Sequence, residues 1–134
     1  MSQQRQNVSG ESLGQPSPWE KVVGYSRAVR VGNVVQVAGT TATIGGQVVG
    51  VGDPYTQTKV ALEIVAQALA AAGASLEQVV RTRLYVTDIS QWQEIGRAHG
   101  EVFGEIRPAA SMVQVAALID PQHLVEIEAE AVLT

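Results

Sequence analysis

Residues 107–132 read RPAASMVQVAALIDPQHLVEIEAEAV, and this stretch decides the fold. Apolar and polar residues alternate on both sides of a turn at residues 119–123, which is typical of two extended segments. In the second segment Glu126, Glu128 and Glu130 fall on one face, because successive strand side chains point to opposite sides. The opposite face carries Val125, Ile127, Ala129 and Ala131. We therefore expect a sheet with one apolar face and one face of carboxylates, which either meet solvent or line a site or an interface.

The composition indicates a small acidic protein. A chain of 134 residues suits a single domain, and a net charge of −4 argues against a broad nucleic-acid-binding surface, which needs clustered Lys and Arg. There is no Cys for disulfide or thiolate chemistry, and the two His show no metal-ligand spacing, so no metal is expected. No apolar run approaches the roughly 20 residues of a membrane span, and the first residues lack the apolar core of a signal peptide. We expect a cytoplasmic protein without a membrane partner.

The first half of the chain predicts a lead-in, a hairpin and a long helix. Residues 1–18 are polar with several Gly and Pro, and we expect them to be mobile or loosely docked ahead of a single domain at residues 19–134. Two β-rich runs around Gly32-Asn33 predict a hairpin, and residues 43–49 predict a further short strand or hairpin. The Asp-Pro pair at residues 53–54, followed by apolar residues at helical spacing and Gly73, predicts a helix.

The second half predicts a strand, a second helix and the two final segments. Residues 79–88 alternate, with Val80, Thr82, Leu84 and Val86 on one face and Arg81, Arg83 and Tyr85 on the other. A capping box at residues 90–93 and an apolar stripe that includes His99 predict a helix ending at Gly104. The order is β-β-β-α-β-α-β-β.

Two helices are too few to cover both faces of such a sheet. The expected fold is α+β, a two-layer sandwich with a mixed six-stranded sheet and both helices on one face. The face without helices, called the open face below, would carry Arg81, Arg83, Tyr85, Gln36, Gln114 and the glutamates. It either contacts another copy of the chain or faces water.

Several short motifs occur in a characteristic order. They are Tyr25, VGN at 31–33, VAG at 37–39, Gln57, AAG at 71–73, VVRT at 79–82, VTD at 86–88, RPA at 107–109 and VEIEA at 125–129. Together they resemble the RidA (YjgF) family of reactive-intermediate deaminases, also called L-PSP endoribonucleases. The resemblance implies a chorismate-mutase-like fold and a homotrimer with clefts between neighbouring subunits. It also implies hydrolysis of enamines and imines without a cofactor.

The resemblance also implies functional residues. Glu126 would orient or activate water, Tyr25 would form the cleft wall, and Ala38 and Gly39 would lie beside the ligand. The family has an arginine directly after Pro-Ala, which binds the substrate carboxylate, and the matching residue here is Ala110. A neutral side chain cannot reproduce that bidentate geometry.

Two further positions depart from the family pattern. Met112 stands where a cysteine is frequent, and it would contribute a backbone carbonyl. Gly96 stands where the family has an asparagine in its second helix.

Other residues could take over the missing role. Arg83 is the first candidate for binding an anionic group, because it is expected on the open face together with Ala110, Met112 and Glu126; the alternative is an ion pair with Glu128 at a subunit interface. His99 is either a hydrogen-bonded core residue or a catalytic group that transfers protons.

Three functions follow from these patterns. The first is a deaminase acting on a small carboxylate-bearing imine or enamine, and the second is a trimer that binds such a carboxylate ligand without chemistry. The third is RNA cleavage or inhibition of translation, which the acidic composition disfavours, so no nucleic-acid partner is expected.

Overall fold

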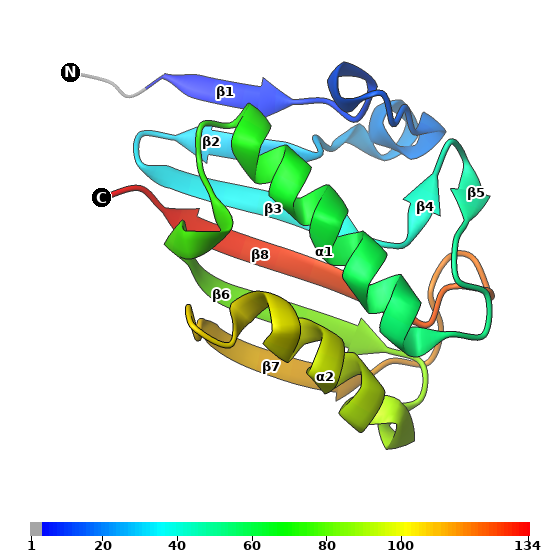
Figure 1. Cartoon of the computed structure of the whole chain (residues 1–134). Helices are drawn as coiled ribbons and strands as arrows, with labels where there is room; N and C mark the ends of the chain where they lie inside the picture. Colours follow the sequence, from blue (N-terminus) through cyan, green and yellow to red (C-terminus); the bar gives the residue numbers. More distant parts are fainter. Residues whose placement is uncertain (1–3) are drawn as a thin grey trace.

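A computed structural model, which describes residues 4–134, shows a six-stranded sheet with two α-helices on one face (Figure 1). The strand order is β1-β2-β3-β8-β6-β7; β6 and β7 are parallel and the other neighbours are antiparallel. The predicted α+β two-layer sandwich with a mixed six-stranded sheet is confirmed. The strands are β1 (Arg5–Val8), β2 (Ala28–Val31), β3 (Val34–Thr40), β6 (Val79–Val86), β7 (Ala109–Gln114) and β8 (Val125–Val132). The helices are α1 (Pro54–Ala71) and α2 (Trp92–Phe103).

Short elements connect these units. A separate two-stranded hairpin consists of β4 (Thr43–Ile44) and β5 (Gln47–Val48). Three 3-10 turns are η1 (Glu11–Leu13), η3 (Leu76–Gln78) and η4 (Ile89–Gln91), and η2 (Glu20–Gly24) is a π-helical turn. Within residues 4–134, no helix combines the length and the apolar character that crossing a bilayer requires.

The N-terminal segment corrects one expectation. Residues 5–8 were expected in a mobile or loosely docked lead-in, but they form β1, which pairs antiparallel with β2 from Arg5 opposite Val31 to Val8 opposite Ala28. Burial of the Val8 side chain in the core fastens this strand. The sixth strand of the sheet is therefore β1, since residues 43–49 form the separate hairpin. The expectation for residues 1–3 lies outside the described part of the chain.

Helix α1 begins and ends where the sequence predicts. The Asp53 side chain accepts a hydrogen bond from the backbone amide of Thr56 at 3.1 Å, and Pro54 occupies the first turn. Gly73 follows the helix with φ of 84°, a left-handed conformation that favours glycine. Both ends are therefore fixed by local chemistry.

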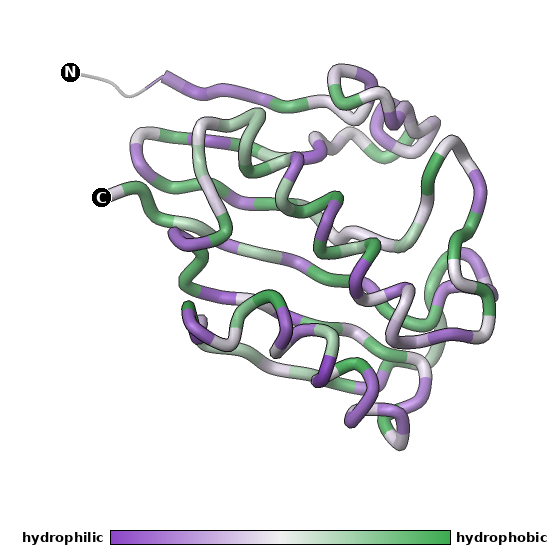
Figure 2. Tube along the Cα trace, viewed as in Figure 1, coloured by the Kyte–Doolittle hydropathy of each residue, from purple (hydrophilic) through white to green (hydrophobic). Residues whose placement is uncertain are grey.

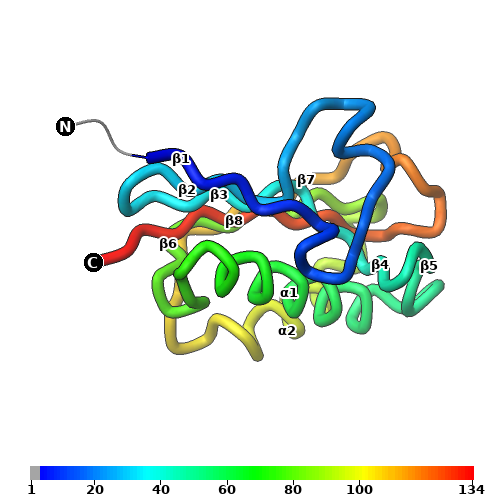
Figure 3. Tube along the Cα trace, turned by 90° about the horizontal axis from the view of Figure 1, so that it is seen from above, coloured from blue at the N-terminus to red at the C-terminus, as the bar shows by residue number. Residues whose placement is uncertain are grey.

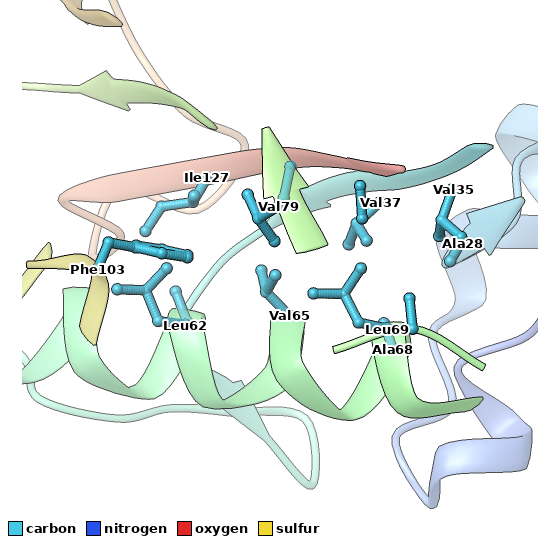
Figure 4. Close-up of a cluster of buried hydrophobic side chains, with 14 of the residues drawn as sticks. Ala28, Val35, Val37, Leu62, Val65, Ala68, Leu69, Val79, Phe103 and Ile127 are labelled. Carbon is cyan, nitrogen blue, oxygen red and sulfur yellow. The ribbon is translucent and has the colours of Figure 1, made fainter. Parts of the chain in front are cut away.

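The core lies between α1, α2 and the sheet. Figure 4 shows Leu62, Val65 and Leu69 of α1 pointing toward side chains of the sheet, with Phe103 of α2 beside them. Both helices lie on the same side of the sheet when the molecule is viewed from above (Figure 3). Burial of these apolar surfaces stabilises the two-layer arrangement and leaves the open face without a helix.

Strand β8 lies between β3 and β6 and follows the predicted alternation. Its Val125, Ile127, Ala129 and Ala131 side chains are buried, whereas those of Glu126, Glu128, Glu130 and Val132 are partly exposed. Figure 2 shows hydrophobic and hydrophilic positions alternating along the strands of the sheet. The glutamates therefore lie on the open face, as the sequence predicts.

Strand β6 contains an irregularity that the sequence pattern did not indicate. Its register with β8 shifts between Val79 and Arg81, so that Val79 is buried and Val80 is 44% exposed. Val80 was expected to share the apolar face of Thr82, and that expectation is wrong, because a bulge changes the alternation at this point. From Arg81 onward the alternation is regular, and Arg83 and Tyr85 reach the open face.

Candidate functional site

A pocket of about 420 Å³ lies on the open face over β2 and β3. It brings together three of the predicted site residues, Tyr25, Ala38 and Arg83. The full lining is Arg5, Asn7, Gly24, Tyr25, Ser26, Val29, Gln36, Val37, Ala38, Arg83 and Glu128. We refer to this hollow as the open-face pocket. Its volume lies within the range of roughly 300–1,000 Å³ that is usual for small-molecule sites.

The Glu126 carboxyl group lies directly beside Gly39. A Cβ atom added to Gly39 would fall 2.8 Å from the Glu126 carboxyl carbon and 2.9 Å from its Oε1. The absent side chain of Gly39 therefore creates the space that the carboxyl group occupies. Because Gly39 follows Ala38, which lines the open-face pocket, Glu126 lies next to the pocket.

The surroundings raise the pKa of the Glu126 carboxyl group above its ordinary value. Burial is the largest cause, and the negative charge of Glu128 adds to it, while the positive charge of Arg27 opposes both. A carboxylate with a raised pKa is a stronger base, which is the property required for taking a proton from water.

Arg27 is a residue that the sequence interpretation missed. It directly precedes β2, and its backbone carbonyl accepts a hydrogen bond from the Ala38 amide at 3.0 Å. Its guanidinium donates through Nη2 to the carbonyl of Gly39, and burial lowers its pKa. Within the described residues, its buried Nε has no hydrogen-bond partner. Counting outward from the Gly32-Asn33 turn pairs residue 27 with residue 38. The predicted hairpin therefore already indicated that Arg27 lies beside Ala38 and Gly39.

Tyr85 and Glu128 form a hydrogen-bonded pair on the open face. The Tyr85 hydroxyl donates to Glu128 Oε1 at 2.6 Å, and this bond raises the Tyr85 pKa. Arg83 lies opposite Glu128 in the register of β6 and β8, yet no ion pair joins the two side chains within the described chain. Arg83 instead contributes to the lining of the open-face pocket. An ion pair made across a subunit interface stays a prediction.

Ala110 and Met112 do not lie on the open face. In the parallel pairing of β6 and β7, Ala110 is opposite Thr82 and Met112 is opposite Leu84, both of which face the helices. Met112 is accordingly half-buried against the core, and Ala110 is exposed on the edge strand. The expectation that they share a face with Glu126 is therefore wrong. The intervening Ser111 takes the open face, where its hydroxyl accepts from Arg81 Nη2 at 3.0 Å.

His99 lies on the helix side of the sheet. Its Nε2 is 2.9 Å from the Thr82 hydroxyl, and its ring centroid is 4.8 Å from that of Phe103. Burial lowers the His99 pKa and favours the neutral ring. Thr82 is buried on the face of β6 opposite to Arg83, so the sheet separates His99 from Glu126 in one chain. The two expected catalytic residues are not brought together.

A second hollow, of about 300 Å³, adjoins His99. Gly100, Phe103, Gly104, Arg107 and Pro108 complete its lining. Among residues 4–134, no group of three or more His, Asp or Glu side chains is arranged to hold a metal ion.

The fold places this chain in the class of small α+β two-layer sandwiches, with two helices on one face of a six-stranded sheet and a polar pocket on the other face. The model of the Endoribonuclease L-PSP family matches residues 17–133. The chain belongs to this family, and the resemblance to the RidA (YjgF) proteins is confirmed.

Three similar proteins illustrate the relationship. The uncharacterized protein SCO2049 of Streptomyces coelicolor is 44% identical over 115 residues, which is 86% of each chain. The 3-aminoacrylate deaminase RutC of Acinetobacter baylyi is 34% identical over 119 residues, covering 88% of this chain and 91% of RutC. The crystal structure of Rv2704 from Mycobacterium tuberculosis, a member of the YjgF/YER057c/UK114 family, is 52% identical with a TM-score of 0.85. The match covers 97% of this chain and 100% of Rv2704.

Proposed function

We propose that this protein is a cofactor-free hydrolase that deaminates a small carboxylate-bearing imine or enamine, at clefts between the subunits of a homotrimer. The observation that carries the proposal is Glu126, a half-buried carboxyl group with a raised pKa beside a polar pocket. Membership of the family that includes the deaminase RutC supports the same reaction type.

The reaction needs water, a base and a site that holds the substrate. Water adds to the carbon of the protonated imine and forms a carbon–oxygen bond, while the electrons of the carbon–nitrogen double bond move to the positively charged nitrogen. Glu126 accepts a proton from that water and returns it to nitrogen. The carbon–nitrogen bond then breaks, and the remaining hydroxyl proton leaves with ammonia as ammonium, so the products are a keto acid and ammonium. An enamine enters this sequence after tautomerising to the imine.

Arg83 is proposed to hold the substrate carboxylate. Its guanidinium lines the pocket together with Tyr25 and Ala38, and no ion pair within the described chain neutralises it. A positioned guanidinium binds a carboxylate through charge-assisted hydrogen bonds, and orientation is a large part of catalysis.

The test replaces Glu126 with its neutral isostere. Glu126→Gln should reduce turnover of small imines by roughly 10²-fold or more, because the base is lost, while circular dichroism shows that the variant remains folded. Glu130→Gln is the matched control, since Glu130 lies on the same face of β8 and binds Gln36. Equal turnover in wild type and Glu126→Gln, in an assay that couples an amino-acid oxidase to keto-acid release, would reject the proposal.

The homotrimer is tested separately. Light scattering at micromolar concentration should give three times the chain mass of 14.2 kDa. A monomer under these conditions would exclude clefts between subunits.

A second function is favoured by Ala110. This position offers a methyl group on an exposed edge strand, where the resemblance implies a carboxylate-binding arginine. A trimer that binds a carboxylate ligand without converting it would fit this loss. Saturable ligand binding in calorimetry, with no keto acid released by either wild type or Ala110→Arg, would support that function instead.

A further inference from the structure

Strand β1 supplies a wall of the open-face pocket, and this wall lies outside the residues that the family model matches. Arg5 and Asn7 both line the pocket, and they alternate onto the same side of β1. The family model begins its match at residue 17, so neither residue belongs to the matched region. The match to the family model therefore assigns no role to this wall.

A chain of hydrogen bonds fixes the β1 wall to the rest of the pocket. Arg5 Nε donates to Asn7 Oδ1 at 3.2 Å, and Asn7 Nδ2 donates to Ser26 Oγ at 2.9 Å. Ser26 directly follows Tyr25, the residue of the expected cleft wall. The Nε bond orients the Arg5 guanidinium, and in residues 4–134 its terminal nitrogens make no ion pair.

The charges of the pocket fit a particular kind of ligand. The charged residues of its lining are two arginines, Arg5 and Arg83, and one glutamate, Glu128. Two arginines match two carboxylates on a ligand, because guanidinium and carboxylate form paired hydrogen bonds. The single Glu128 matches one protonated nitrogen, such as that of an iminium group.

We propose that the open-face pocket selects ligands with two carboxylates, one bound by Arg83 and the other by Arg5 of β1. The substrate class is then the imine or enamine of a dicarboxylic amino acid. This assignment of substrate rests on the proposed deaminase function. The preference of the pocket for ligands with two carboxylates does not depend on that function. Arg83 lies on β6 opposite Glu128 and takes the carboxylate next to the reacting carbon, and Arg5 takes the distal one.

The test compares two four-carbon acids at fixed ionic strength. Calorimetry measures binding of succinate, which has two carboxylates, and of butyrate, which has one. Wild type should bind succinate at least tenfold more tightly, the order expected for an added charged hydrogen bond. Arg5→Gln should abolish this preference by weakening succinate alone, and Arg83→Gln should weaken both acids.

Arg97→Gln is the matched control, because Arg97 lies on α2, where it pairs with Glu94 and Glu101. This variant should keep the succinate preference of the wild type. Circular dichroism of each variant confirms that β1 and the sheet remain folded. A wild type that binds succinate no better than butyrate, or an Arg5→Gln variant that keeps the preference, would overturn the proposal.

The outcome separates this inference from the proposed function. Loss of succinate preference in Arg5→Gln supports the two-carboxylate pocket even where Glu126→Gln turns over imines as fast as wild type. In the reverse case, dependence of turnover on Glu126 together with an unchanged preference in Arg5→Gln retains the deaminase and rejects the role of β1.

Discussion

The carboxyl group of Glu126 fills the space where a side chain on Gly39 would lie: a Cβ added to Gly39 would fall 2.8 Å from the carboxyl carbon of Glu126. The two residues come from adjacent strands, β3 and β8. Arg27 donates a hydrogen bond through Nη2 to the Gly39 carbonyl, and its positive charge acts on Glu126. The position of the Glu126 carboxyl group therefore requires a glycine at residue 39.

Gly39→Ala should displace the Glu126 carboxyl group. Overpacking of this kind costs about 1–3 kcal/mol of stability, and a misplaced base should lower turnover by roughly tenfold or more. Thermal unfolding and steady-state assays measure the two effects.

Gly100→Ala is the control for this substitution. Gly100 lies inside α2, and an added Cβ would meet no atom within 4 Å. This variant should keep full turnover and gain roughly 0.5–1 kcal/mol of stability, because alanine is the better helix former. A Gly39→Ala variant as active and as stable as Gly100→Ala would contradict the role assigned to the contact.

Glu128→Gln should shift the pH profile of turnover. The Glu128 charge raises the pKa of Glu126, so its removal lowers that pKa, and the base form of Glu126 then persists to lower pH. The acid limb of the profile should move to lower pH, while Glu130→Gln should leave it in place. An acid limb that stays in place or moves to higher pH in Glu128→Gln would show that the Glu128 charge does not act on the base in this way.

The raised pKa of Glu126 also has a consequence for stability. A carboxyl group whose folded-state pKa exceeds the unfolded value binds its proton more tightly in the folded state. Folding is therefore favoured at low pH, and this contribution is lost as pH rises from the unfolded pKa through the folded one. In Glu126→Gln this loss should disappear, so that the variant gains stability relative to wild type as pH rises through that window in chemical denaturation.

His99→Leu should lower stability with little effect on turnover. The substitution leaves the buried Thr82 hydroxyl without its partner, which costs about 1–3 kcal/mol. Because burial lowers the His99 pKa, the unfolded state binds the proton more readily, and the wild type loses this stability as pH falls below about 6.5. The stability difference between wild type and variant should therefore shrink on acidification. A large fall in turnover without a fall in stability would give His99 a catalytic role.

Ala110→Arg should increase turnover only where subunits share a site. The register places residue 110 on the helix side of β7, so the introduced guanidinium does not reach Glu126 of its own chain. Turnover is measured in mixtures of wild-type chains with chains carrying both Ala110→Arg and Glu126→Gln. Activity above that of a mixture containing Glu126→Gln alone would show that one chain completes the site of another.

The sequence pattern predicted the elements more successfully than their pairing. Alternation at Glu126, Glu128 and Glu130 placed the carboxylates on the open face, and the Asp53 cap located the start of α1. The β1 strand was missed because RQNV is short and mostly polar, and its pairing depends on contact with β2. Tertiary contacts of this kind override local propensity.

The local sequence pattern also could not predict which face of the sheet carries Ala110. The register between β6 and β7 is set by the crossover through α2, and a shift of one residue moves every side chain to the other face. The backbone at Arg107, two residues before β7 begins, adopts φ of 57°, a conformation that is uncommon for a residue other than glycine and that no local pattern indicates. The face of the strand that follows this turn therefore cannot be read from alternation alone.

The central position of β8 has a consequence for synthesis on the ribosome. This strand follows all the others in the sequence, yet it joins β3 on one side to β6 on the other. Until it has been translated, the nascent chain carries two partial sheets, each with an unpaired strand edge that is prone to association. The site carboxylate arrives on the same strand, so the step that closes the sheet also delivers Glu126 to Gly39.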